Sequence, residues 1–371
     1  MIIRKSYISY IFQGFKQNRL GTTLKYPVRY IGTLMGYKLD KSLSGPIQGT
    51  LCLTYNCNLR CEMCYLPLRH LDFEKNTNKK ALTLKDYQKV IDDFAAIGTS
   101  GLALSGGEPM LHPDLYEIIK YARKRELVVQ MTTNGWFINE ETVLKLFEAG
   151  LNTISISLDG ASAQTHNKIR RNEKSFEKAT NAISLIHKLR KIEKNSIKLN
   201  ISSTLGKNNY REAIQLVELS KNLGADYIGF MPVHAIAPDF DTHDYANLDS
   251  TDISELISTV DQLISLKKKD HFIETSFEYL SMFKDFYQNK KLPIPCMAGF
   301  TTLIVDCYGE VFPCFSFYEM KKSWGNIEKH NGLKSFWNSG ELNIERVKIK
   351  TCRECFWNCQ VETNLLYKPF I

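Results

Sequence analysis

The stretch GTLCLTYNCNLRCEMC, residues 49–64, decides the fold of this 371-residue chain. It begins with a short apolar run that predicts a buried strand, and it ends with three cysteines in CX3CX2C spacing, Cys57, Cys61 and Cys64. Tetrahedral zinc usually takes four protein ligands, whereas three cysteines leave a position of an iron–sulfur cluster open to a substrate. The motif therefore predicts an iron–sulfur cluster in the loop after the strand, with zinc or inert thiols as the alternatives.

Beyond this stretch, short apolar runs alternate with helical patterns. Strands are predicted at 49–55, 101–105, 127–132, 152–158, 197–204 and 226–232, and helices at 84–97, 113–124, 139–149, 175–189 and 210–223. Strands joined by crossover helices form a parallel sheet with right-handed connections. We therefore expect an α/β fold with a partial (β/α)6 TIM-like barrel, or else an open doubly wound sheet. Either fold places a site at the carboxyl ends of the strands.

The remaining sequence predicts three further parts. Two amphipathic helices at 252–266 and 272–286 follow the last strand, and TTLIVDCYGEVFPC at 301–314 predicts a hairpin that turns at 307–309. A short helix is expected at 333–337. The expected division is a basic, aromatic arm at 1–48, the barrel at 49–238, a helical connection at 239–291 and a small cysteine-rich domain at 292–371.

The composition is that of a globular protein, with 43% hydrophobic and 24% charged residues. The chain has no long apolar run that predicts a membrane span and no pattern of a signal peptide, so we expect a cytoplasmic protein with reduced cysteines. Of the net charge of +8, residues 1–48 carry +7, with eight Lys or Arg and one Asp. The rest of the chain is nearly neutral and predicts no nucleic-acid partner.

Three further motifs end consecutive predicted strands: SGGEP at 105–109, TTNG at 132–135, and SISLDG at 155–160, which HNKIR follows at 166–170. Glycines let a ligand approach the backbone closely, and the carboxylate of SGGEP can hold an ammonium group. Taken singly, SGGEP and TTNG could be a helix-capping turn and an ordinary turn. Their order after the CX3CX2C motif favours one shared site.

The segment CNLRCEMC at 57–64 resembles the cluster motif of the radical S-adenosylmethionine (SAM) enzymes. The resemblance implies that Cys57, Cys61 and Cys64 bind a 4Fe-4S cluster, that SAM binds its open iron, and that electron transfer yields a 5'-deoxyadenosyl radical. It also implies a low-potential electron donor such as flavodoxin or ferredoxin. Met63 stands where family members usually have an aromatic residue beside the adenine.

The strand-end motifs resemble those of the peptide-modifying radical SAM enzymes. The resemblance places Gly106, Gly107 and Glu108 at the SAM amino group. It places Asn134, Ser157 and Asp159 near the ribose and Arg170 near the SAM carboxylate; the sequence does not separate Arg170 from Arg171.

The late cysteines resemble a twitch domain, the shorter relative of the SPASM domain. The resemblance implies one auxiliary 4Fe-4S cluster on Cys296, Cys314, Cys352 and Cys355, with Cys359 as the competing ligand and structural zinc as the alternative. Cys52 and Cys307 are expected to be a buried small residue and a turn residue.

One departure concerns the general base. Related sulfatase-maturating enzymes have an aspartate directly after the cysteine that corresponds to Cys314, but Phe315 stands there in this chain. Other candidates for a proton acceptor are His234, Asp239, Asp241, His243 and Glu319.

The sequence thus predicts a radical SAM enzyme that abstracts a hydrogen atom and modifies a peptide or protein side chain. A small molecule such as a sugar or alcohol is the alternative substrate, and a lipid-linked substrate follows from the basic arm alone. That arm could contact an anionic membrane or an acidic partner, or could pack across the bottom of the barrel. A non-catalytic metal-binding scaffold is the alternative from another class.

Overall fold

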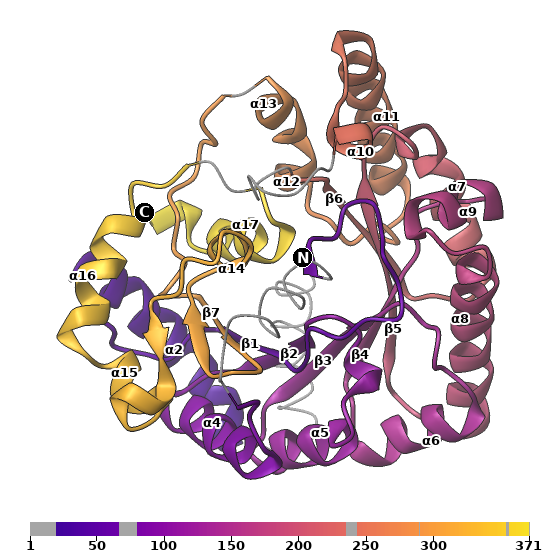
Figure 1. Ribbon diagram of the computed structural model, residues 1–371. Coiled ribbons are helices and arrows are strands. Elements are labelled where there is room, and N and C mark those ends of the chain that lie inside the picture. Colours follow the sequence, from indigo (N-terminus) through magenta and orange to yellow (C-terminus); the bar gives the residue numbers. More distant parts are fainter. Residues whose placement is uncertain (1–19, 67–79, 235–242, 289, 354–355, 371) are drawn as a thin grey trace.

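The computed structural model describes residues 20–66, 80–234, 243–288, 290–353 and 356–370, and for residues 20–26 it describes the backbone only (Figure 1). The expected arm up to residue 19, and the candidates Asp239, Asp241 and Cys355, lie outside these residues. Among the described helices, none has the length and apolar character needed to cross a membrane.

One nine-stranded sheet organises the chain, in the order β6-β5-β4-β3-β2-β1-β7-β8-β9. Neighbouring strands from β6 to β7 are parallel, and β8 and β9 add antiparallel pairs. The strands are β1 Gln48–Cys52, β2 Gly101–Ser105, β3 Val128–Thr133, β4 Thr153–Ser157, β5 Lys198–Leu205, β6 Tyr227–Pro232, β7 Thr302–Asp306, β8 Glu310–Phe312 and β9 Gly325–Asn326. This confirms the α/β fold with a partial barrel.

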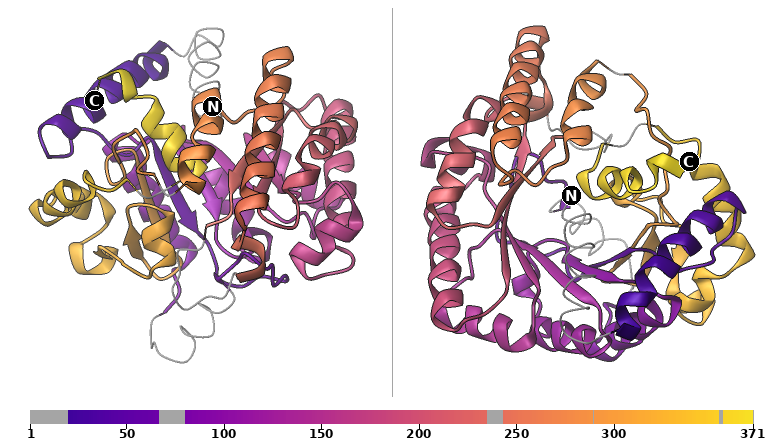
Figure 2. Two further views of the ribbon diagram at one scale, coloured as in Figure 1. Left: turned by 90° about the horizontal axis from the view of Figure 1, so that it is seen from above. Right: turned by 180° about the vertical axis from the view of Figure 1, so that it is seen from behind.

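Helices cover the outer face of the curved sheet, as both views in Figure 2 show. Those of the repeats are α4 Leu84–Ile97, α5 Leu115–Lys124, α6 Glu140–Ala149, α7 Ala163–Arg170, α8 Ser175–Ile192 and α9 Ala213–Asn222. Capping residues set the ends of two of them. Thr83 forms a capping box at the start of α4 and Gly98 ends that helix in the left-handed conformation, and Asn139 and Gly150 do the same for α6. In α5, α8 and α9 no side chain of the described residues caps the first turn.

The two faces of the sheet differ in polarity. Alternate residues such as Leu104, Met131 and Ile154 are buried beneath the helices. The positions between them carry hydroxyl and amide groups that line an inner cavity: Ser105, Gln130, Thr132, Ser155, Ser157, Asn200, Ser202 and Thr204. Because period-two alternation sends successive side chains to opposite faces, the helix side is a dry core and the barrel interior is polar.

The expected hairpin at 301–314 forms, and its first strand also joins the barrel. Ile304 of β7 is paired with Phe312 of β8, and on its other side β7 lies parallel to β1, with Ile304 opposite Thr50. The cysteine-rich part of the chain therefore continues the sheet that carries the CX3CX2C loop.

The expected helix at 272–286 was wrong in its first part. After α10 His243–Ala246 and α11 Ser250–Lys269, the chain runs extended and bridges to β6 through Ile228 and Ile273. The Thr275 hydroxyl accepts a hydrogen bond from the Phe230 N–H (2.8 Å), so pairing with an open strand edge outweighs the helical pattern. Only then follow α12 Phe277–Ser281 and α13 Phe283–Tyr287.

Helix α17 (Asn358–Leu365) spans the gap between β6 and β7 (Figure 1). The Asn358 amide donates to the Phe230 carbonyl of β6 (3.3 Å), and the Gln360 amide oxygen accepts from the Thr302 hydroxyl of β7. The Gln360 amide nitrogen also donates to the side chain of Asn364 (2.7 Å). One helix thus ties the two sides of the partial barrel together.

Helix α2 (Leu20–Lys38) packs on the C-terminal part of the chain. Tyr30 stacks on Tyr367 with ring centroids 4.4 Å apart, and its hydroxyl donates to the Leu366 carbonyl (2.7 Å). The other helices of this part are α14 Phe315–Glu319, α15 Leu333–Trp337, where a short helix was predicted, and α16 Gly340–Ile349.

Replacing Gln360 with Leu tests the closure by α17. Gln360 is 2% exposed, and the substitution removes its hydrogen bonds with the Thr302 hydroxyl and with the Asn364 side chain, although the Thr302 hydroxyl keeps the Pro313 carbonyl as an acceptor (2.8 Å). We expect a loss of about 1–3 kcal/mol and a fall in Tm of about 2–6 °C by thermal unfolding. The matched control is Gln164→Leu on the exposed face of α7. An equal Tm for both variants would contradict the closing role of Gln360.

Candidate active site

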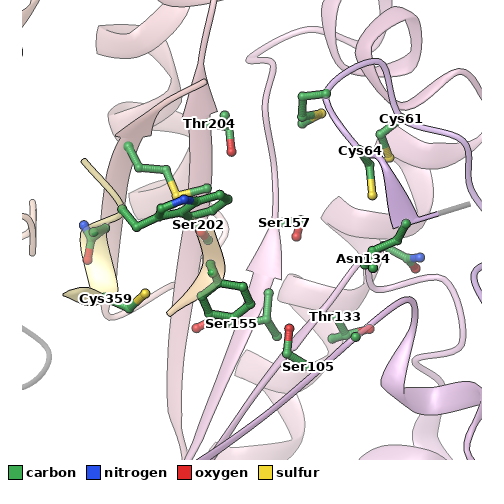
Figure 3. A pocket seen from close by; sticks show the side chains of 18 of the residues that line it. Cys61, Cys64, Ser105, Thr133, Asn134, Ser155, Ser157, Ser202, Thr204 and Cys359 are labelled. Carbon is green, nitrogen blue, oxygen red and sulfur yellow. The ribbon is translucent and has the colours of Figure 1, made fainter. Parts of the chain in front are cut away.

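A cavity of about 390 Å³ opens at the carboxyl ends of strands β2 to β6. Cys57, Cys61, Cys64 and Cys359 line it, and Figure 3 shows Cys61 and Cys64 across the cavity from Cys359. The other residues expected at SAM that line it are Met63, Gly106, Gly107, Glu108, Asn134, Ser157 and Arg170. The structure therefore brings all but one of the residues expected at the cluster and at SAM to one cavity; the exception is Asp159.

The SGGEP turn holds the cysteine loop in place. The Gly107 N–H donates to the Thr54 carbonyl (2.7 Å), and the Glu108 N–H donates to the Asn56 carbonyl (2.8 Å). A Cβ atom on Gly107 would lie 2.1 Å from the Asn56 oxygen, and Gly106 has a φ of +121°. Because any side chain at 107 collides with backbone, glycine is required here for contact between two protein segments.

The carboxylate of Glu108 joins the SGGEP and TTNG motifs. It is 1% exposed, and it accepts hydrogen bonds from the Thr133 hydroxyl (2.7 Å) and from the N–H groups of Asn134 (2.9 Å) and Met110 (3.1 Å). Burial raises the pKa of Glu108, and these hydrogen bonds oppose the shift. A carboxylate has about four acceptor positions, so one more donor from a ligand can still be accommodated.

Asn134 lies between the TTNG turn and the cysteine loop. Its amide nitrogen donates to the Asn58 side chain (2.9 Å) and lies 4.0 Å from the Cys57 sulfur. Its oxygen accepts from the Trp136 N–H (2.9 Å), which fixes the orientation of the amide. Asn134 therefore has its donor side turned toward the cysteine loop.

The structure distinguishes Arg170 from Arg171. The guanidinium of Arg170 is paired with the Asp159 carboxylate and lies 3.7 Å from the Cys61 sulfur, with 12% of the side chain exposed. Arg171 is exposed and ends α7 in the left-handed conformation. Arg170 is thus the arginine at the cavity.

Asp159 occupies a different place from the one expected beside the ribose. Its side chain is fully buried, lies behind Arg170, and accepts the Thr204 N–H (2.8 Å). A buried carboxylate needs a charged partner, and here that partner is Arg170, so Asp159 orients the arginine from behind the cavity wall.

Two buried residues behind this wall of the cavity were not identified as functional candidates from the sequence. His166 is 1% exposed, and its Nδ1 accepts the Asp159 N–H (3.1 Å). Burial, together with the nearby charge of Arg170, lowers the pKa of His166 to about 3. The Asn209 amide donates to the carbonyls of Asp159 (2.7 Å) and Thr204 (2.8 Å). His166 lies in the quoted HNKIR segment, whereas nothing in the sequence marked Asn209.

The three cysteines of the CX3CX2C motif are sheltered thiols. Burial raises the pKa of Cys57 and of Cys61, and it raises the pKa of Cys64 to about 12. The charge of Arg170 opposes the shift at Cys61. Metal ligation requires thiolates, so a cluster bound here would displace the protons of these thiols. Three cysteines on one wall of a cavity have the chemistry that a cluster with an open position needs.

The late cysteines divide between two places. Cys296 and Cys352 line a small second cavity beside Gln360, while Cys359 lines the main cavity. Cys314 is 7% exposed at the start of α14. The structure thus places Cys296 with Cys352, and it places Cys359 on the main cavity.

Two cysteines lie away from these sites. Cys52 and Cys307 are buried in an apolar cluster with Tyr55 and Phe312, and Cys307 lies in the hairpin turn.

Among the candidate proton acceptors in the described residues, Glu319 lines the main cavity. His234 is 8% exposed and stacks on Trp357, with ring centroids 4.6 Å apart. The structure describes the backbone of His243 but not its side chain.

Comparison with known families gives two matches. The model of the radical SAM superfamily matches residues 51–219, and the model of the SPASM iron–sulfur cluster-binding domain matches residues 296–359.

Curated relatives differ in how much of their length aligns. An AdoMet-dependent heme synthase of Methanosarcina barkeri is 35% identical over 47% of this chain and 46% of its own length. A GTP 3',8-cyclase of Aquifex aeolicus is 25% identical over 85% of this chain and 96% of its own. The subtilosin biosynthesis protein AlbA of Bacillus subtilis is 25% identical over 79% of this chain and 60% of its own length. The chain thus spans less than half the length of the heme synthase.

Solved structures share the fold. SuiB of Streptococcus suis bound to the precursor peptide SuiA has a TM-score of 0.64 at 16% identity, covering 90% of this chain and 78% of SuiB. The protein anSMEcpe with bound AdoMet has a TM-score of 0.62 at 18% identity, and the match covers 83% of this chain and 84% of anSMEcpe.

Gly107→Ala tests the contact between the SGGEP turn and the cysteine loop. Its Cβ atom would collide with the Asn56 carbonyl and displace the cysteine loop. We expect anaerobically reconstituted protein to lose about four irons per chain, one cubane cluster. The control is Gly340→Ala, where an added Cβ meets nothing within 4 Å. Full iron in Gly107→Ala would show that the loop does not depend on this contact.

His166→Asn tests the neutral imidazole behind Asp159. The pKa of His166 in the folded protein, about 3, lies below the ordinary value, so acid favours the unfolded state, which takes up the proton. Between pH 7 and pH 5.5, the Tm of the metal-free variant should fall less than that of the wild type, by the equivalent of about 1 kcal/mol. The exposed His271→Asn is the control. Parallel pH profiles for wild type and His166→Asn would refute this role.

Proposed function

Because the chain belongs to the radical SAM superfamily and carries a SPASM domain, we propose that it oxidises or crosslinks a side chain of a peptide or protein. One observation carries the proposal: the CX3CX2C cysteines, three strand-end motifs and residues of the SPASM part line one cavity. When bound, the cluster and SAM supply a 5'-deoxyadenosyl radical, which takes a hydrogen atom from the substrate.

Different residues of the cavity would bind different groups of SAM. Glu108 would accept the SAM ammonium group at its remaining acceptor position, and Arg170, held by Asp159, would face the carboxylate. Asn134 and Ser157 would lie at the ribose, and Met63 near the adenine. With substrate bound, the surrounding barrel would limit access of water to the radical, which protects it from side reactions.

The late cysteines would hold the auxiliary iron–sulfur cluster. Cys296 and Cys352 supply two ligands from one small cavity, and Cys314 a third. Cys355 is the proposed fourth ligand, with Cys359 as the competitor; the place of Cys359 on the main cavity favours Cys355. A low-potential donor such as flavodoxin or ferredoxin would supply the electron.

A peptide substrate is supported by the named functions of similar proteins. AlbA takes part in the biosynthesis of a bacteriocin, and SuiB, whose fold covers 90% of this chain, was solved with a precursor peptide. The second candidate is a small molecule, favoured by the alignment with 96% of the GTP 3',8-cyclase of Aquifex aeolicus.

Iron and SAM cleavage test the enzyme class. After anaerobic reconstitution, we expect about eight irons per chain in the wild type and about four in the Cys57→Ala/Cys61→Ala/Cys64→Ala variant. The wild type should convert SAM to 5'-deoxyadenosine under a chemical reductant, and the variant should not. Zinc is quantified in parallel, because one retained zinc would make the second metal site structural.

The substrate class needs its own measurement. The enzyme is co-expressed with the products of any short reading frames that flank its gene, and peptide masses are compared with those from the triple-cysteine variant. Loss of two hydrogen atoms from one peptide supports the proposal. Unchanged peptides, together with 5'-deoxyadenosine formation that a nucleotide or sugar stimulates, would overturn it in favour of the small molecule.

A further inference from the structure

Helix α2 has apolar side chains on two of its faces. On the inner face, Tyr30 and Tyr37 pack on the buried cluster around Tyr367. The outer face exposes four large apolar side chains at spacings of three and four residues, which places them on one side of the helix and its last turn. These residues, called the apolar ridge below, are Val28 (70% exposed), Ile31 (57%), Met35 (43%) and Leu39 (52%).

So much exposed apolar surface on one helix is unusual. A helix that is apolar all round is normally buried, whereas α2 packs on its own protein by its inner face. Of the twelve large apolar side chains exposed in the described part of the chain, five lie within residues 28–43. Single exposed leucines need no explanation, but neighbouring apolar side chains on one helix face mark an interaction surface.

The sequence around the ridge is basic. Lys38 and Lys41 are exposed at the end of the helix, and the acidic Asp40 is paired with Lys350. Residues 1–19 contain four basic side chains and no acidic one. Exposed apolar side chains flanked by Lys and Arg suit an anionic lipid bilayer, because the apolar groups enter the headgroup region while the cations meet the lipid phosphates.

The same charges disfavour a second copy of this chain as the occupant of the ridge. A two-fold dimer pairs the same surface of both copies. It would bring together two N-terminal segments that each carry a net charge of +7 over residues 1–48. Like charges across an interface oppose association, whereas an anionic lipid surface supplies the opposite charge.

Helix α2 lies at the end of the sheet opposite the cavity and on the outside of the molecule (Figure 2). Arg29 donates to the Thr99 carbonyl (3.3 Å) and the Ser100 hydroxyl (3.1 Å), just before β2 begins. Tyr37 packs edge-on against Phe300, just before β7, with ring centroids 5.3 Å apart. The cavity lies at the carboxyl ends of the strands, so a surface bound to α2 leaves it open to substrate.

We propose that the apolar ridge docks this protein on an anionic lipid bilayer. The ridge side chains would enter the headgroup region, and Lys38 and Lys41 would meet the lipid phosphates. The helix would lie in the plane of the interface, on the side of the barrel away from the cavity. This inference goes beyond the proposed function and does not depend on it.

Vesicle flotation tests the proposal on the full chain. Reconstituted protein is mixed without oxygen with vesicles of phosphatidylglycerol and phosphatidylcholine in equal parts, or of phosphatidylcholine alone, and floated through a density gradient. We expect binding to the anionic vesicles to be at least about tenfold stronger than binding to phosphatidylcholine. It should weaken as the salt concentration rises, because salt screens the attraction between lysines and lipid.

Two double variants locate the contact. Ile31→Ser/Met35→Ser should weaken binding to the anionic vesicles about tenfold or more, because two exposed apolar side chains no longer enter the lipid. Lys38→Gln/Lys41→Gln should weaken it about fivefold or more and make the remaining binding less sensitive to salt.

The matched control is Leu144→Ser/Ile192→Ser, which changes apolar residues that are 39% and 59% exposed on α6 and α8. It should bind the vesicles as the wild type does. Iron content and Tm show that each variant folds. All variants should form 5'-deoxyadenosine at the wild-type rate, because the ridge lies away from the cavity. If the serine variant fails to fold, the lysine variant and the salt dependence of the wild type decide.

Three results would overturn the inference. One is wild-type protein that floats with neither kind of vesicle or equally with both. Another is binding to anionic vesicles that survives in both double variants. The third is a wild-type dimer that does not bind vesicles and that Ile31→Ser/Met35→Ser converts to a monomer, which would assign the ridge to a second copy. Loss of 5'-deoxyadenosine formation in the wild type would instead overturn the enzyme class.

Discussion

Two backbone hydrogen bonds hold the cysteine loop against the neighbouring strand, from Gly107 to Thr54 and from Glu108 to Asn56. The contact is so close that glycine is required at 107. It fixes the loop that carries the three cysteines, and through the Glu108 carboxylate it also fixes the TTNG turn on the next strand. Three strand ends are therefore locked together before any cofactor binds, which is the preorganisation that a radical site needs.

The polarity of the sheet determines what the barrel can do. Its outer face packs dry against helices, while its inner face presents serine, threonine, asparagine and glutamine. A barrel whose interior is filled by apolar side chains has no room for a ligand, whereas this one has a cavity with a polar floor. The SPASM part contributes Phe315, Trp357 and Cys359 to the cavity, and β7 and α17 join this part to the sheet of the barrel.

Much of this was predictable from sequence, because period-two and helical patterns are local. The six strands of the barrel lie within a few residues of the predicted ranges, and the hairpin at 301–314 forms as expected. The pairing of β7 with β1 was not predictable, because the sequence of an apolar strand does not determine which other strand it pairs with. The extended run at Ile273 was mistaken for helix, because the open edge of β6 that recruits it is a tertiary feature. Asp159 was placed beside SAM, yet only the fold shows that it lies behind Arg170.

The central claim is that one cavity holds the cluster and SAM on its cysteine side. The most direct test is a crystal structure of the reconstituted enzyme, grown without oxygen, with SAM. The account predicts a cluster on Cys57, Cys61 and Cys64 and the SAM carboxylate at Arg170. SAM bound outside this cavity would contradict it.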